Sequence, residues 1–231
     1  MKTNLDNLQI LFEDNHIIVV NKRAGDLVQG DRTGDAPLAE IIKEFIKKRD
    51  QKPGNVYLGV VHRLDRPTSG AVIFAKTSKA LSRLNQAFAN KEPKKTYWAV
   101  VKNPPPKKAD RLIHYLLRKP KQNKSFAHTK EVNGSKQAFL DYQLLKSLTN
   151  YYLLEINLAT GRHHQIRSQL SKIGCPIKGD LKYDFDRSNK DGSIHLHARK
   201  IEFIHPVRKG ELSIKAPVNK EDAIWKACCN L

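Results

Sequence analysis

Hydrophobic and polar residues alternate along the chain in a pattern that predicts many short strands interrupted by a few helices. Runs rich in Val, Ile, Leu, Phe and Tyr, bounded by turn-forming residues, indicate strands. In the first ninety residues the predicted strands are 9–13, 16–21, 57–61 and 71–75. Apolar side chains spaced three and four residues apart predict helices after Pro37 and after Thr77, with Thr77 and Ser78 as the cap of the second.

The rest of the chain is predicted to be mostly strand. The predicted strands are 94–101, 137–145, 151–158, 194–204 (one bent strand or a pair) and 211–216. A helix is expected after Arg162, with Ile166 and Leu170 on its buried face and Gly174 just beyond its end. Residues 102–130 are predicted to be irregular apart from one short apolar island. Because the sequence contains neither a long linker nor a repeat, we expect one domain over residues 1–231.

Composition places the chain among folded, water-soluble proteins. Hydrophobic residues make up 39% of the sequence and charged residues 28%, and no apolar run reaches the length that crosses a membrane. Residues 1–6 lack the apolar core of a signal peptide, and the three cysteines do not suggest a disulfide framework. We therefore expect a cytoplasmic protein with no membrane partner.

The positive charge of the chain indicates a polyanionic partner. The formal net charge is +19, and residues 91–136 alone hold 13 Lys and Arg against 3 Asp and Glu, a net of +10. Such a field attracts nucleic acid, although lysines that are merely solvated would give the same count. We interpret the basic segment 102–130 as an arm that faces RNA.

The central motif of the sequence is the loop from His62 to Gly70. Its acidic residue, Asp65, lies between Arg63 and Arg66, and the following Pro-Thr-Ser-Gly favours a turn between two buried strands. Nearby cations favour the ionised form of a carboxyl group. An ionised Asp65 suits a nucleophile or an electrostatic anchor, and the alternative is a structural Asp–Arg pair at a strand end.

Histidines offer a competing interpretation of the chemistry. The chain has nine, including His163 beside His164 and the pair His195 and His197, which would lie on one face of a strand. That arrangement suits a metal-dependent hydrolase, but the sequence shows no clear third ligand, no zinc-type cysteine spacing and no phosphate-binding GxxxxGK[ST] motif. We expect no metal and no cofactor.

Four separated stretches resemble, in order, the motifs of the RluA-type pseudouridine synthase family. They are Leu11–Lys22, the His62–Gly70 loop, Lys95–Val101, and Leu158–Arg167 followed by Pro176–Asp180. The resemblance runs from about Leu8 to about Ala216 and includes Leu196-His197-Ala198. It departs from the family at Arg23, where proline is usual, and at Leu140 and His163, where threonine is common. The S4 module that some relatives carry is expected to be absent.

The resemblance implies a fold and a reaction. The fold would be α+β, with a long mixed and mostly antiparallel sheet flanked by helices and crossed by a central cleft. The enzyme would isomerise specific uridines of ribosomal RNA or tRNA to pseudouridine without a cofactor, acting on RNA as a monomer. A catalytically idle RNA-binding or assembly protein on the same fold is the alternative.

The resemblance also implies roles for particular residues. Asp65 would be the nucleophile, Arg167 its salt-bridge partner, and Tyr97 would pack on the uracil and either move the C5 proton or only order the base. Arg63 would fill the space left by the flipped base or bind phosphate, and His62 would order the loop. The complete set of expected RNA-binding residues is His62, Arg63, Arg66, Arg162, His163, Gln165 and Leu196.

Overall fold

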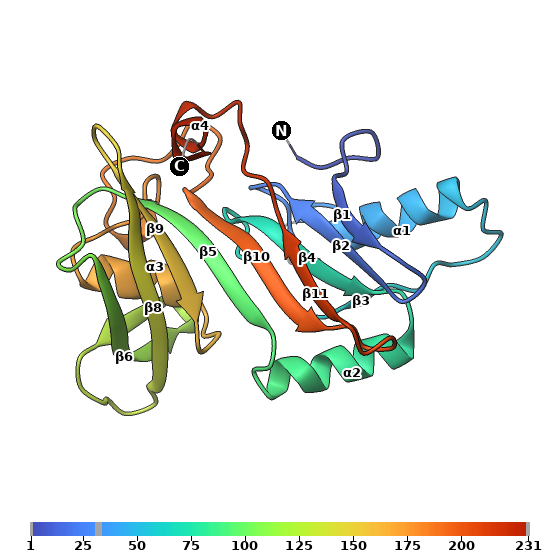
Figure 1. Ribbon diagram of the computed structural model, residues 1–231, viewed down its shortest axis with the longest axis horizontal. Coiled ribbons are helices and arrows are strands. Elements are labelled where there is room, and N and C mark those ends of the chain that lie inside the picture. The colour runs from blue at the N-terminus through green and yellow to red at the C-terminus, as the bar shows by residue number, and fades with distance from the viewer. Residues whose placement is uncertain (1, 31–33, 230–231) are drawn as a thin grey trace. The chain divides into compact units, whose positions relative to one another are not determined.

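The computed structural model describes residues 2–30 and 34–229 and divides the chain into two compact units (Figure 1). Unit 1 comprises Met1–Pro93 and Ala198–Pro217, and unit 2 comprises Lys94–His197 and Val218–Leu231. The strand β10 (Leu196–Ile204) begins in unit 2 and continues into unit 1. The expectation of a single catalytic domain stays a prediction.

Unit 1 is a mainly antiparallel sheet with a helix on each face. Its strands follow the order β1-β2-β4-β10, with β3 beside β4 and β11 beside β10. The pairs β1–β2, β2–β4, β3–β4 and β10–β11 are all antiparallel. The elements are β1 (Ile10–Glu13), β2 (Ile17–Lys22), α1 (Leu38–Arg49), β3 (Gly59–Val60), β4 (Ser69–Ala75), α2 (Ser78–Ala89) and β11 (Glu211–Lys215).

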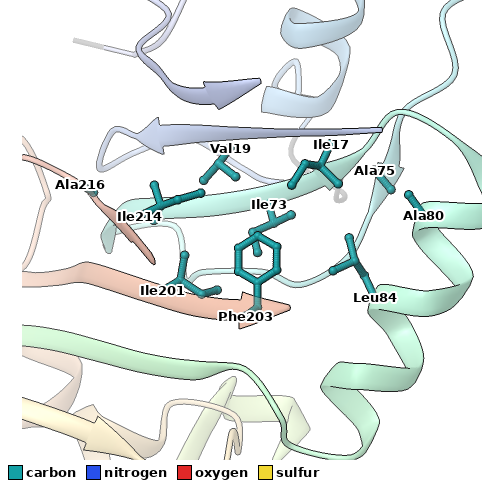
Figure 2. Packing of buried hydrophobic residues seen from close by; sticks show 11 residues of the cluster. Ile17, Val19, Ile73, Ala75, Ala80, Leu84, Ile201, Phe203, Ile214 and Ala216 are labelled. Atoms are coloured by element: carbon teal, nitrogen blue, oxygen red, sulfur yellow. The ribbon is translucent and has the colours of Figure 1, made fainter. Parts of the chain in front are cut away.

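The side chains of β2 and β4 alternate between two hydrophobic clusters. Ile17, Val19 and Ile73 pack with Leu84 of α2 and with residues of β10 and β11 (Figure 2). The residues between them along the strands, which include Ile18 and Phe74, pack against α1 on the other face. Because both faces are covered, these strands are apolar at nearly every position, as their sequence predicted. Thr77 caps α2 as expected, since its hydroxyl accepts the Ala80 amide at 3.2 Å.

Unit 2 is an antiparallel sheet in the order β5-β9-β8-β6-β7. Its elements are β5 (Lys94–Val101), β6 (Ala109–Lys119), η1 (Pro120–Gln122), β7 (Lys124–His128), β8 (Lys136–Ser147), β9 (Tyr152–Leu158), α3 (Gln165–Lys172), η2 (Leu181–Tyr183) and α4 (Ala223–Cys229). As predicted, α3 stops before Gly174, whose φ of +76° is typical of the residue that follows a helix.

One sequence prediction in unit 2 needs correction, and one helix was missed. Residues 102–130 are not irregular, because 109–128 form the long hairpin β6–β7. Polar residues at the exposed positions of β6 hid a strand whose other face buries Leu112, His114 and Leu116. The helix α4 was not predicted, and it buries Trp225 and Cys228 in a cluster with residues of β5 and β9.

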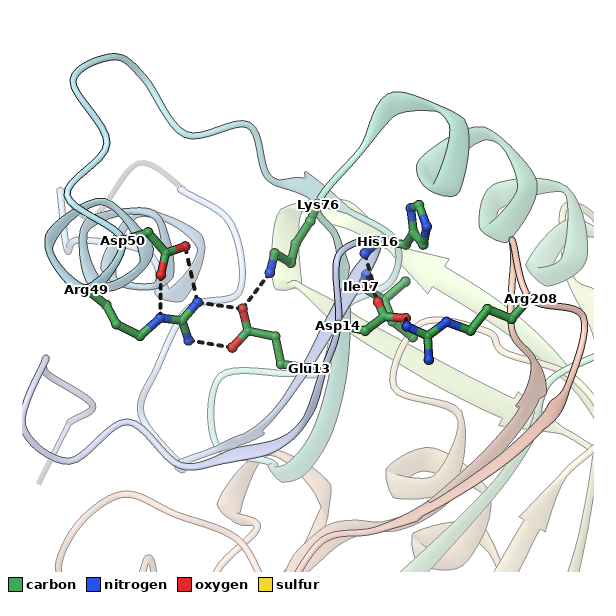
Figure 3. A network of polar contacts seen from close by, with 8 residues as sticks. All are labelled: Glu13, Asp14, His16, Ile17, Arg49, Asp50, Lys76 and Arg208. Carbon is green, nitrogen blue, oxygen red and sulfur yellow. Dashed lines mark hydrogen bonds and ion pairs between the residues drawn. The ribbon is translucent and has the colours of Figure 1, made fainter.

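A polar network joins the end of β1 and the β1–β2 turn to α1 and to Lys76, the residue after β4 (Figure 3). Arg49 binds Glu13 through two hydrogen bonds of 2.6 and 2.9 Å, and Lys76 donates to the same carboxylate at 2.5 Å. Asp14 accepts the amides of His16 and Ile17 at 2.8 and 2.9 Å. These carboxylates fix the turn between the first two strands.

Replacing Glu13 with glutamine is expected to reduce the free energy of unfolding by about 1–3 kcal/mol at neutral pH. The Arg49 guanidinium, opposed by burial and assisted by Lys76, holds the pKa of Glu13 below its usual value of 4.5. Because the pKa of Glu13 is lower in the folded protein than in the unfolded chain, its ionised form stabilises the fold above pH 4.5. This stabilisation is lost as the pH falls through the lowered pKa of the folded protein. Urea unfolding should therefore show a large difference between variant and wild type at pH 7 that shrinks below about pH 4.5.

The matched control for this measurement is Glu44→Gln. Glu44 also pairs with a basic residue, Lys48 at 2.8 Å, but both side chains are more than half exposed. Its replacement should change the free energy of unfolding by less than about 0.5 kcal/mol. Equal losses in the two variants would contradict a special role for the Glu13 network.

Within the residues that the structure describes, no helix combines the length and the apolar composition needed to span a membrane.

Candidate active site

The loop that carries Asp65 is ordered by contacts from both of its ends. His62 follows the short strand β3, and its Nε2 accepts the amide of Ile73 in β4 at 3.1 Å. Its ring also stacks on Phe88 of α2, with the centroids 4.9 Å apart. Beyond Asp65, the Thr68 amide donates to the Asp65 carbonyl at 3.0 Å and closes a turn. Asp65 itself is partly exposed, and Arg63 is exposed.

A buried lysine, Lys22, holds the backbone of this loop. Its ammonium group donates to the carbonyls of Arg23, Arg66 and Thr68 at 2.9, 3.1 and 2.7 Å, while the residue is only 1% exposed. Burial lowers the pKa of Lys22 to about 8, against the opposing effects of Asp26 and Asp65. The lysine therefore ties the end of β2 to the loop and places positive charge near Asp65. Sequence analysis missed this role, although a lysine that closes the run of apolar residues in β2 was a signal.

Replacing Lys22 with methionine is expected to cost about 2–3 kcal/mol of folding free energy, because three backbone carbonyls lose a charged donor. Local order should fall as well, so limited proteolysis should cut within residues 62–70 more readily than in the wild type. The control is Lys43→Met, which removes only an ion pair with Glu40 on the surface of α1 and should change stability by less than about 0.5 kcal/mol. If both variants showed similar unfolding curves and similar cleavage, Lys22 would not hold the backbone of the Asp65 loop in place.

Arg66 has an acidic partner that the sequence did not reveal. Its guanidinium forms an ion pair with Asp35, and Lys2 pairs with the same carboxylate at 2.8 Å. Hydrogen bonding to Lys2 lowers the pKa of Asp35, and Arg66 adds to the effect. Both partners are partly exposed, so the pair fixes the direction of Arg66 more than it stabilises the fold.

Close packing explains the glycine that ends the loop. Gly70 has a φ of +118°, and a Cβ at this position would lie 2.4 Å from the carbonyl oxygen of Ala198 in β10. Only glycine accommodates both the backbone conformation and this neighbour. The loop therefore runs directly against β10 as it enters β4.

In unit 2, Arg167 lies in a buried ion pair on α3. Its Nε and Nη2 donate to the two carboxylate oxygens of Asp180, each at 2.7 Å, and the two side chains are 6% and 1% exposed. The guanidinium also lies over the ring of Tyr183, 5.0 Å from its centroid. Asp180 was seen in the sequence only as part of a turn. The expected pairing of Arg167 with Asp65 joins residues of different units and stays a prediction.

The segment before α3 is held by its own side chains. Gln165 is buried, and its Oε1 accepts the Thr160 hydroxyl at 2.8 Å and the Arg162 amide at 3.0 Å. His164 adopts a left-handed conformation, with φ of 51°, and its Nδ1 lies 2.9 Å from the Tyr183 hydroxyl. The ring of His163 stacks on that of His164 at 3.8 Å. The hydrogen bonds to Gln165 therefore fix the residues that precede α3, whereas the side chain of Arg162 is exposed to solvent.

The other predicted site residues of unit 2 lie on strands. Tyr97 is on β5, opposite Ile156 of β9, and is 8% exposed. Leu196 is the first residue of β10 and is also buried. The predicted residues therefore form two groups: His62, Arg63, Asp65 and Arg66 on one loop of unit 1, and the remaining six in unit 2.

The histidine pair that suggested a metal site packs on a tryptophan. His195 and His197 lie with their ring centroids 5.2 and 5.9 Å from that of Trp225. His195 Nε2 is 3.2 Å from Asp222. Burial raises the pKa of Asp222, but hydrogen bonds from His195 and from the amides of Trp225 and Ile224 outweigh it and lower the pKa to about 2. Over residues 2–30 and 34–229, no group of three or more His, Cys, Asp or Glu side chains is placed to hold a metal ion.

Proteins with related sequences are named as pseudouridine synthases. Residues 16–172 match the family model described as RNA pseudouridylate synthase. The ribosomal large subunit pseudouridine synthase C of Buchnera aphidicola is 35% identical over 224 residues, which cover 94% of this chain and 69% of that protein. The tRNA pseudouridine synthase C of Vibrio vulnificus is 29% identical, over 95% of this chain and 93% of its own length.

Solved structures agree with the predicted α+β fold. Human RNA pseudouridylate synthase domain containing 4 superposes with a TM-score of 0.79 at 23% identity, over 95% of this chain and 92% of the other. Human RNA pseudouridylate synthase domain containing 1 gives 0.75 at 20% identity, over 99% and 90%. The fold prediction is confirmed. Because the family model covers more than half of the residues and a relative matches at 35% identity, the chain belongs to the RNA pseudouridylate synthase family.

Proposed function

We propose that this pseudouridine synthase acts on a uridine in ribosomal RNA or tRNA and uses the carboxylate of Asp65 as its catalytic group. The observation that carries the proposal is a partly exposed Asp65 on a loop whose backbone is fixed by Lys22 and His62. The names of the relatives, which specify ribosomal RNA in one case and tRNA in another, support these two RNA classes as substrates.

The reaction is an isomerisation within one nucleotide. The N-glycosidic bond between N1 and C1′ breaks, the uracil turns, C5 bonds to C1′, and the hydrogen on C5 leaves as a proton while N1 regains one. No atom is added overall, and no redox step is required. An ionised Asp65 serves this chemistry either by attacking C1′ or by assisting a glycal-like intermediate, and both routes begin from the same carboxylate.

Other residues would contribute by binding and orientation. Tyr97 would pack on the uracil, and Arg167 would supply positive charge that favours the ionised carboxylate. Arg63, which is exposed on the Asp65 loop, would occupy the space that the flipped base leaves in the RNA stack. We expect Arg66, with its direction fixed by Asp35, to bind RNA phosphate. Action as a monomer and a cytoplasmic location stay predictions.

Release of tritium tests the proposal directly. Ribosomal RNA and tRNA transcripts that carry tritium on C5 of uridine are incubated with the protein, and label in water is measured together with pseudouridine in the RNA. We expect both products in equal amounts from at least one of the two RNA classes. Binding of both RNAs without release from either would instead support the idle RNA-binding protein. Release that a chelator abolishes would favour a metal-dependent enzyme.

A further inference from the structure

The turn of the β6–β7 hairpin carries a compact group of positive charges outside the residues assigned above to catalysis. We define the hairpin tip as residues 118–124, where Arg118, Lys119, Lys121 and Lys124 occur without any acidic residue. The first three of these side chains are exposed. Lys182, also exposed, lies next to the tip because its Nζ donates to the Asn123 carbonyl at 3.1 Å. Five positive charges therefore gather at one end of unit 2.

Contacts with the segment before α3 hold the hairpin tip in place. Asn123 adopts a left-handed conformation, with φ of 45°, and its side-chain oxygen lies 3.2 Å from Nε2 of His163. The other ring nitrogen of His163 is 2.9 Å from the Ser125 hydroxyl. The Ser125 amide also donates to the Tyr183 hydroxyl at 2.8 Å. A surface fixed in this way loses little conformational entropy when it binds a ligand.

The charges at the tip are not neutralised, in contrast to those at the base of the same hairpin. At the base, Lys107 pairs with Asp110 at 3.1 Å and Arg111 with Asp141 at 2.7 Å. Within the described part of the chain, no ion pair involves the four basic residues of the tip or Lys182. Instead, the ammonium groups of Lys119 and Lys124 lie 5.1 and 5.4 Å from the ring centroid of Phe126. The tip thus keeps its full charge available for an external anion.

We propose that the hairpin tip binds the phosphate backbone of the substrate RNA. The inference rests on the proposed function for the identity of the RNA. Phosphate contacts of this kind supply affinity and orientation without reading bases. A hollow of about 410 Å³ lined by residues 117–122, including Leu117 and Pro120, gives a ribose or base apolar surface beside the charges. His163 is the positioning residue that keeps the tip in this arrangement.

The test replaces the three exposed charges together, as Arg118→Gln, Lys119→Gln and Lys121→Gln. Releasing fewer counterions should reduce the slope of log affinity against log salt by about 2–3 for the substrate RNA. The dissociation constant should rise about tenfold to a hundredfold at roughly 100 mM salt. The rate of tritium release at saturating RNA should stay within twofold of the wild type, because the tip takes no part in bond breaking.

A second triple variant separates a local site from the general field of the protein. Lys47→Gln, Lys48→Gln and Lys52→Gln remove the same charge from exposed positions at the end of α1 and just after it. This control should change the salt slope by less than about one. Equal slope changes in the two triple variants, or an unchanged slope in the tip variant, would overturn the proposal. A tip effect on binding in a protein that releases no tritium would support this site and refute the proposed function, so the two failures are distinguishable.

Discussion

An Asp65→Asn enzyme is expected to form pseudouridine at least about 10⁴-fold more slowly than the wild type. The amide keeps the size of the side chain but has neither the negative charge nor the nucleophilic oxygen that we propose for the reaction. The substitution keeps the backbone contacts that order the loop, which are made by the Asp65 carbonyl, Lys22 and His62. Single-turnover release of tritium from C5-labelled RNA measures the loss.

Affinity for RNA gives the second readout of the same experiment. We expect the dissociation constant of Asp65→Asn to stay within about threefold of the wild type, since phosphate contacts dominate binding. Asp6→Asn is the matched control, because Asp6 is an exposed aspartate of a turn near the N-terminus and should leave both quantities unchanged. A residual rate within tenfold of the wild type in Asp65→Asn would remove Asp65 from the chemistry.

The elements that sequence analysis located best are those marked by a fully buried run or by two local signals that agree. The strand predicted at 94–101 coincides with β5, because every residue from Thr96 to Val101 is buried and the run from Tyr97 onward is apolar. The helix α2 was located by its apolar spacing together with the Thr77 cap, two local signals that agree. Local chemistry of this kind needs no knowledge of distant parts of the chain.

The features that sequence analysis missed depend on contacts between distant residues. Lys22 donates a hydrogen bond to the carbonyl of Thr68, 46 positions along the chain. Its place at the end of an apolar strand marks it as unusual, but the local sequence does not identify the distant carbonyls that it binds. The hairpin β6–β7 was hidden because its exposed positions carry charges, which lower the hydrophobicity of the segment without preventing a strand. Asp180 was visible as a turn residue, but its pairing with Arg167 depends on how α3 packs against the segment that follows it.

Replacing Asp180 with alanine is expected to cost about 3–5 kcal/mol of folding free energy, because it leaves the buried Arg167 guanidinium without the carboxylate that binds it through two hydrogen bonds. Urea unfolding at pH 7 measures the loss. Asp184→Ala is the control, since Asp184 lies in the same segment but is exposed, and its carboxylate accepts the Ser171 hydroxyl. It should cost less than about 1 kcal/mol, and equal losses would show that the Arg167 pair is not special.

A double substitution separates the contribution of this ion pair to stability from its contribution to the reaction. Arg167→Met combined with Asp180→Leu removes both charges and fills the space with apolar groups, an exchange that is often neutral for stability. We therefore expect unfolding within about 2 kcal/mol of the wild type. Pseudouridine formation should still be slowed by at least about a hundredfold if Arg167 supplies positive charge to the nucleophile, as we propose. A stable double variant with normal tritium release would confine Arg167 to a structural role, whereas a stable and inactive one would assign its charge to the reaction.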